Sequence, residues 1–181
     1  MESSEVRDQA QEGRGAALGF ISVCKLDART YRGGILVTDD RGRPLEFRAS
    51  TPLRPDGVQT ILYGNSLFPA ITQDLCGLVL VQSIKDRPQV VLADHWAFLQ
   101  LHSDGLPVVW VRAGDTLEVE GREFEGEEDF ISSDKFESVV VQFAPGVTPA
   151  VRETVHRTLE AASGQVSLLE PFARVATAIT V

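Results

Sequence analysis

The sequence has little of what marks secreted, zinc-binding or membrane-spanning proteins. It contains only two cysteines, Cys24 and Cys76, which do not form a paired metal-binding spacing. Each has apolar neighbours, which favours buried free thiols in a reducing compartment and predicts a cytoplasmic location. No apolar run approaches the roughly 18 residues of a membrane-spanning helix. Residues 1–17 are polar at their start and lack the apolar core of a signal peptide, so we expect a flexible N-terminal tail and no membrane segment.

The sequence also lacks a concentrated basic region. Its net charge is -9, and residues 115–137 hold ten acidic residues against two basic ones, which leaves the rest of the chain close to neutral. Proteins that bind nucleic acid through its phosphates need clustered Lys and Arg. Nucleic acid is therefore a possible partner that charge does not support. We interpret residues 115–137 as an acidic insertion or flap.

Conventional catalytic motifs are absent as well. The chain has no P-loop, no GxGxxG, no HExxH and no GxSxG pattern. Gly33 and Gly34 lie inside an expected strand, where a bulge or a close backbone contact is a better explanation than phosphate binding. The three histidines are scattered and predict no site by themselves.

What is present is the pattern of a mixed α/β fold. Three strands are expected at 18–26, 31–38 and 44–50, joined as an antiparallel meander by short turns. Two near-continuous apolar runs, 90–93 and 108–111, are typical of strands buried on both faces. Helices are expected at 55–62, 67–85, 96–101, 149–164 and 170–179, the fourth with Thr148 as its N-cap and Pro149 as its first residue, and a further strand is expected at 138–143. We predict an α/β core over residues 18–114, with residues 138–181 as a helical C-terminal part that packs on it.

Three aspartates stand out within this order. Asp27 closes the first strand, Asp74 lies in the long helix, and Asp94 closes the strand at 90–93. If they converge at one sheet edge, their oxygens suit a hard divalent ion such as Mg²⁺ or Mn²⁺, and such ions can activate water against a phosphodiester. The alternative interpretation is structural: Asp27 as a turn residue, Asp74 facing solvent, and Asp94 as a helix cap.

The order of three strands, helix, strand, helix, strand, with acids on the first strand, the helix and the fourth strand, resembles the ribonuclease H-like superfamily. Its spacing is most similar to that of endonuclease V. The resemblance covers roughly residues 18–112. It implies a nuclease-like scaffold on which Asp27, Asp74 and Asp94 take the positions of the metal-binding carboxylates.

Three functions follow from these observations. The first is a non-catalytic or weakly catalytic subunit that contacts another protein chain in a larger complex. Its candidate contact residues are Trp96, Trp110, Phe124, Glu127, Glu128 and Asp129. The second is a divalent-metal-dependent nuclease that uses the three aspartates. The third is a small-ligand sensor with a pocket at the strand ends.

Overall fold

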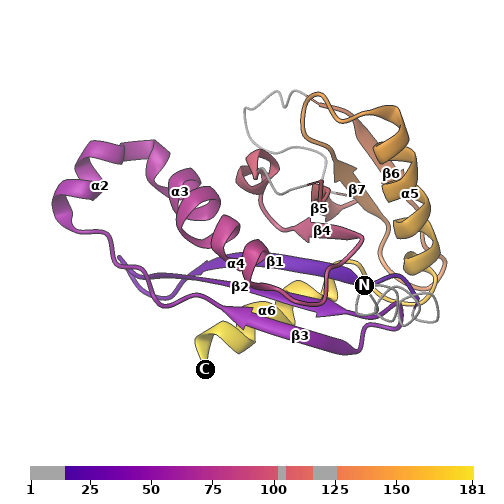
Figure 1. The fold of residues 1–181 in the computed structure, drawn as a ribbon, viewed down its shortest axis with the longest axis horizontal. Coiled ribbons are helices and arrows are strands. Elements are labelled where there is room, and N and C mark those ends of the chain that lie inside the picture. The colour runs from indigo at the N-terminus through magenta and orange to yellow at the C-terminus, as the bar shows by residue number, and fades with distance from the viewer. Residues whose placement is uncertain (1–14, 102–104, 116–125) are drawn as a thin grey trace, which may run out of the picture.

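We describe residues 15–101, 105–115 and 126–181 of a computed structural model (Figure 1). The strands are β1 (Leu18–Lys25), β2 (Tyr31–Thr38), β3 (Pro44–Ala49), β4 (Val90–Ala93), β5 (Val108–Ala113), β6 (Glu128–Ile131) and β7 (Val139–Gln142). The helices are α2 (Gly57–Tyr63), α3 (Leu67–Ala70), α4 (Leu78–Ser83), α5 (Pro149–Ser163) and α6 (Glu170–Thr180), with the 3-10 helices η1 (Gly64–Ser66) and η3 (Trp96–Gln100) and the π-helix η2 (Ile71–Gly77). The expected N-terminal tail lies mostly outside the described residues.

The strands form one mixed sheet in the order β3-β2-β1-β4-β5-β7-β6. The first three strands are an antiparallel meander, and β4 and β5 then add in parallel to β1. The predicted α/β fold class, a meander followed by parallel crossovers with a helical C-terminus, is confirmed. β7 and β6 extend the sheet in the antiparallel sense.

The sheet is buried on both faces because its central strands alternate two sets of apolar side chains. Leu18, Phe20, Val90 and Leu92 pack in one core with residues of α5 and α6. Ile21, Ile35, Val91 and Ala93 pack in a second core with residues of η2, α4 and η3. This double burial is the reason that β4 and β5 read as continuous apolar runs.

Gly33 and Gly34 allow the two helical layers to approach β2. A Cβ on Gly33 would lie 2.9 Å from Cys76 Cβ and Leu80 Cδ1, and a Cβ on Gly34 would lie 2.6 Å from Ile179 Cγ2. Both residues pair with β1 in an uninterrupted register. The close-contact interpretation of this pair is therefore correct, and no bulge is needed.

The expected helix at 67–85 differs from the observed one in two ways. It contains the π-helical segment η2, and its last turn ends at Ser83. Apolar residues nearly encircle this helix in the sequence, which predicts cover on most sides, but Leu75 and Val79 are 53% and 54% exposed. Ser66 does not cap it through its side chain, because helical structure already precedes it in η1.

The C-terminal part follows its sequence signals closely. Thr148 caps α5 by accepting a hydrogen bond from the backbone N–H of Val151, and Pro149 occupies the first turn. Val155 and Leu159 of α5 and Phe172 and Val175 of α6 are buried against the sheet. None of the helices in the described part of the chain is long and apolar enough to cross a membrane.

Replacing Gly34 with Val should lower the free energy of unfolding by about 1–3 kcal/mol, because the new side chain overlaps Ile179 and Val175 of α6. Urea unfolding measures this change. Gly57→Ala is the matched control, since nothing lies within 4 Å of a Cβ at that position. Equal stability of the two variants would contradict the close packing of α6 on β2.

Candidate functional site at the ends of β1 and β4

Asp94 follows the last residue of β4 and lies beside β1. The parallel register pairs Ile21 with Ala93, so the next residues, Ser22 and Asp94, are neighbours across the two strands. The Ser22 hydroxyl donates a hydrogen bond of 2.5 Å to the Asp94 carboxylate. Ser22 is buried, whereas Asp94 is exposed to solvent. The pair thus presents one accessible carboxylate at the carboxyl end of a central strand, where open α/β sheets place ligands.

The surroundings of Asp94 favour its protonated form. Neighbouring protein atoms displace water from the Asp94 carboxyl group, and this desolvation raises its pKa to about 6. The hydrogen bond from Ser22 acts in the opposite direction. Partial burial also raises the pKa of the Cys24 thiol, which lies 3.9 Å from Ser22 Oγ. Ser22 Oγ is therefore within hydrogen-bonding distance of both the Asp94 carboxyl group and the Cys24 thiol.

An aromatic group adjoins this pair. The His95 ring lies 4.8 Å from the ring of Phe68 and 5.2 Å from that of Trp96, measured between centroids. His95 Nδ1 accepts a hydrogen bond from the backbone N–H of Ala97 and so caps η3. The cap that the structural interpretation assigned to Asp94 is thus made by His95.

Asp27 lies in the turn after β1 and its oxygens are already used there. It accepts hydrogen bonds from the backbone N–H groups of Arg29 and Thr30 and from the Thr30 hydroxyl. These bonds, that of Arg29 first, hold the pKa of Asp27 below its usual value. The alternative interpretation of Asp27 as a turn residue describes its place in the structure.

Asp74 lies on the other side of the sheet from the Ser22–Asp94 pair. It belongs to η2, whose buried residues pack on the core that contains Ile21 and Ile35. Asp74 itself is exposed. Ser22 and Asp94, by contrast, continue the alternation of Leu18, Phe20, Val90 and Leu92, which face α5 and α6.

The residues present do not fit the predicted three-carboxylate metal site. Within the described ranges, no group of three or more His, Cys, Asp or Glu side chains is placed to hold a metal ion. The position on β1 that faces Asp94 carries the hydroxyl of Ser22, and the nearest acid along β1, Asp27, is engaged in its turn. Sequence reasoning missed Ser22, although a polar residue inside the apolar run of β1 was the available signal.

The predicted contact residues have varied surroundings. Phe124 lies outside the described residues, and Trp110 is only 5% exposed, so Trp110 is wrong as a surface contact; its ring packs 4.9 Å from the Arg112 guanidinium. Trp96 is half-buried. The three acids are held within the chain: Glu127 and Asp129 pair with Arg152, and Glu128 pairs with Arg112.

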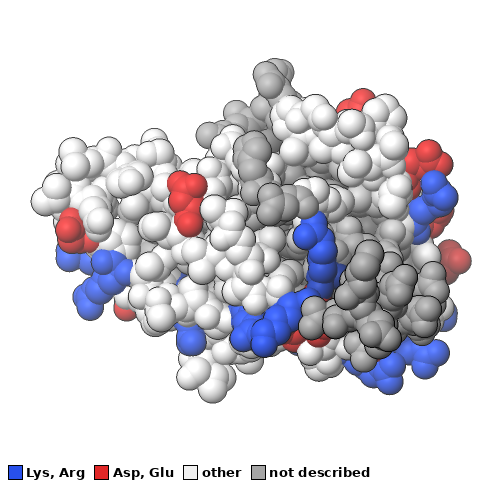
Figure 2. All heavy atoms as spheres, in the orientation of Figure 1, with Lys and Arg blue, Asp and Glu red and all other residues white. Residues whose placement is uncertain are grey.

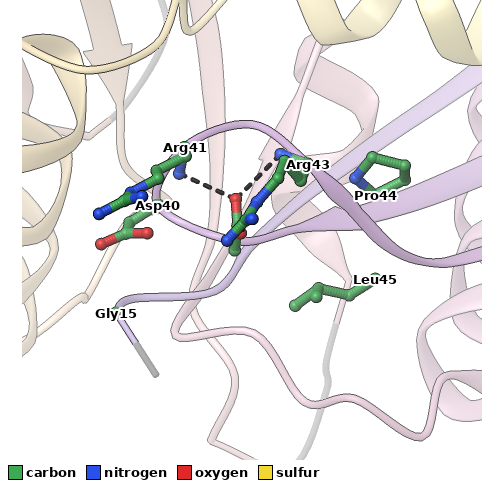
Figure 3. Close-up of a pocket in the computed structure, with 7 residues that line it drawn as sticks. Gly15, Asp40, Arg41, Arg43, Pro44 and Leu45 are labelled. Atoms are coloured by element: carbon green, nitrogen blue, oxygen red, sulfur yellow. Dashed lines mark hydrogen bonds and ion pairs between the residues drawn. The ribbon is translucent and has the colours of Figure 1, made fainter. Parts of the chain in front are cut away.

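A cavity of about 600 Å³ lies at the other end of the strands from Asp94, on the turn between β2 and β3 (Figure 3). Asp39 stabilises this turn by accepting hydrogen bonds from the backbone N–H groups of Arg41 and Arg43. Partial burial alone would raise the pKa of Asp39, but these hydrogen bonds outweigh it and lower the pKa. The aspartate therefore has a structural role, and the cavity is remote from Asp94.

The least expected surface is a projection formed by α2, η1, α3, η2 and α4, which we call the helical arm (residues 57–83; Figure 1). Asp74 is its only charged residue. No residue of α2 is buried, and Val58, Ile61 and Leu62 are 65%, 81% and 78% exposed. In Figure 2 the upper surface of the arm is almost entirely white, whereas acidic and basic side chains lie along the lower edge of this end of the molecule.

The chain is weakly similar to solved structures of endonuclease V. A structure of human endonuclease V aligns with 97% of this chain and 87% of its own at 14% identity, with a TM-score of 0.44. One from Ciona intestinalis, in complex with a 24mer DNA containing an inosine followed by a ribo-adenosine, covers 96% and 94% at 12% identity and a TM-score of 0.43. Marinitoga piezophila Argonaute with a guide RNA covers 82% and 26% at 14% identity, with a TM-score of 0.32. No protein-family model and no curated protein matches.

Asp94→Asn tests the electrostatics of the site. A carboxyl whose pKa rises from about 3.9 unfolded to about 6 folded takes up a proton on folding between these values. The contribution of Asp94 to stability should therefore fall as pH rises from 4 to 7, so the Asn variant should gain stability relative to wild type over this range. Because Asp94 keeps contact with solvent, we expect the Asn variant to gain about 1 kcal/mol in its free energy of unfolding, which is less than the pKa shift would give for a group fully shielded from solvent.

Urea unfolding at pH 4 and pH 7 measures this difference, with Asp134→Asn as the control for removing one exposed acid. The same difference between wild type and Asp94→Asn at both pH values would contradict a raised pKa at Asp94.

Proposed function

We propose that this chain is a non-catalytic subunit on a ribonuclease H-like scaffold and acts through protein–protein contacts. The observation that carries the proposal is the helical arm, which exposes large apolar side chains and has a single charge. The composition of the Ser22–Asp94 site supports the same conclusion.

The arm has the properties of a contact surface. Val58, Ile61 and Leu62 follow a helical spacing of three and four residues, so they share one face of α2, which we call the α2 stripe. The helix is also defined by a capping box, in which Asp56 and Gln59 satisfy each other's backbone N–H groups. A seven-residue helix is marginal in water unless its apolar face is packed. The described residues of this chain leave that face open, so a partner is the natural source of the missing packing.

The chemistry of the arm favours a protein as the partner. Nucleic acid is held by Lys and Arg, and residues 57–83 contain neither. Helices that lie on membranes usually carry Lys and Arg on their polar face, which is also missing here. Exposed apolar surface with a polar border is typical of protein contacts.

The site at β1 and β4 supports a loss of catalysis. Two-metal hydrolysis requires several oxygen ligands around each ion. Asp94 brings one carboxylate and Ser22 a hydroxyl, while Asp27 is engaged in its turn and Asp74 is on the other layer. The described residues of this site therefore do not support a metal-dependent step. A nuclease remains the second candidate because Asp94 is accessible at the carboxyl end of a central strand.

The purified protein should not cleave single- or double-stranded DNA or RNA in the presence of Mg²⁺ or Mn²⁺. The substrates should include DNA with an inosine followed by a ribo-adenosine, the ligand of one similar structure. Gel assays of wild type and Asp94→Asn should give identical, background signals. Cleavage by wild type that Asp94→Asn abolishes would establish the nuclease instead.

The second prediction concerns the arm in its cellular setting. The full chain, tagged and expressed in its native cells, should elute in extracts at a mass well above 19.8 kDa. Ile61→Asp should shift it toward the monomer, because a charge on the stripe opposes burial. Val181→Asp adds the same charge at a fully exposed apolar residue and should leave the elution unchanged. Monomeric elution of wild type would contradict a role in protein contacts.

A further inference from the structure

We infer that the partner of the helical arm is a second copy of this chain, with the α2 stripes of two protomers packed together. This inference rests on the proposed function and identifies its partner. The argument depends on how charge is distributed over the molecule, on the apolar area of the arm, and on the symmetry that such a contact requires.

Charge restricts where two copies can meet. Each chain has a net charge of -9, and residues 57–83 contribute only Asp74 to it. Two identical surfaces must be complementary to themselves, so like charges cannot face one another across the contact. The α2 stripe satisfies this requirement because Val58, Ile61 and Leu62 meet only apolar groups when two stripes face each other.

The position of the arm keeps the acidic parts of two copies apart. α2 lies at one end of the molecule, and β6 and α5 lie at the other (Figure 1). β6 carries Glu128 and Asp129, and Arg152 of α5 pairs with Glu127 and Asp129. Charges separated by more than about 8 Å of physiological salt solution are largely screened. Contact through the arm tips therefore avoids most of the repulsion between two acidic chains.

The apolar area of the arm is of the order of that in a weak dimer contact, and four of its six large exposed apolar residues belong to α2. Its exposed large apolar residues are Val58, Ile61, Leu62, Tyr63, Leu75 and Val79, which are exposed by about half to four fifths. Fully exposed, such side chains each offer on the order of 60–120 Å² of apolar surface, so at their observed exposure the six supply roughly 230–460 Å². An interface of standard size buries about 450 Å² of apolar surface per partner.

Sedimentation equilibrium on the purified full chain tests the inference. At about 10 µM, above the micromolar Kd at the weak end for interfaces of this size, wild type should have twice the monomer mass of 19.8 kDa. The dimer should persist at 0.5 M NaCl, because the contact is apolar. Ile61→Asp should weaken dimerisation by at least about 30-fold, as for a central interface residue, and Val181→Asp should not.

Amide hydrogen exchange gives an independent measure that does not rely on a variant. Amides of α2 should be protected at high protein concentration and should exchange faster on dilution, while amides of the buried strand β4 should not respond. Circular dichroism should show Ile61→Asp folded, since Ile61 is 81% exposed.

The outcomes separate the inference from the proposed function. A monomeric wild-type protein, or a dimer that survives Ile61→Asp, overturns the second copy as partner. If the purified chain is monomeric while its large mass in extracts still depends on Ile61, the partner is a different protein and the proposed function stands. Binding of the purified chain to neutral phosphatidylcholine vesicles through Ile61, with no dimer, would overturn both.

Discussion

The structure depends on the burial of the parallel pair β1 and β4 between two helical layers. These strands alternate apolar side chains into both cores, so neither face of the pair reaches solvent over most of its length. Such burial fixes the register strongly, because a shift by one residue would exchange the two sets of side chains. The register in turn determines which polar residues meet where the strands end.

The fold class could be predicted from sequence because the signals for it are local. Continuous apolar runs indicated central strands at 90–93 and 108–111, and Thr148 with Pro149 marked the start of α5. The site could not be predicted in the same way, because it depends on pairing between distant strands. Ser22 faces Asp94, and β1 continues about 10 Å further to Lys25 before the turn that holds Asp27. Choosing Asp27 as the β1 acid required a register that apolar patterning does not provide.

The exposed arm was missed for a related reason. The apolar residues of 67–85 surround the helix, and periodicity alone indicates burial for such a pattern. Whether burial comes from the same chain or from another is not encoded in the pattern. Leu80 and Val81 face the sheet, while Leu75 and Val79 face outward from the same helical segment. Covering both sides would have needed a further layer over η2 and α4, and the described C-terminal helices cover the opposite face of the sheet instead.

The two ends of the molecule therefore differ in how they satisfy their surface groups. Around β6, Glu127, Glu128 and Asp129 pair with Arg112, Arg152 and His156, so these three carboxylates are held within the chain. Surface ion pairs of this kind contribute little to stability, but they reduce the attraction of these three carboxylates for a basic partner. At the arm, the described residues leave large apolar side chains exposed, and only contact with another surface removes such groups from water. In the described part of the chain, the acids around β6 thus have partners within the fold and the apolar side chains of the arm do not, and this asymmetry is the reason for placing the proposed contact at the arm.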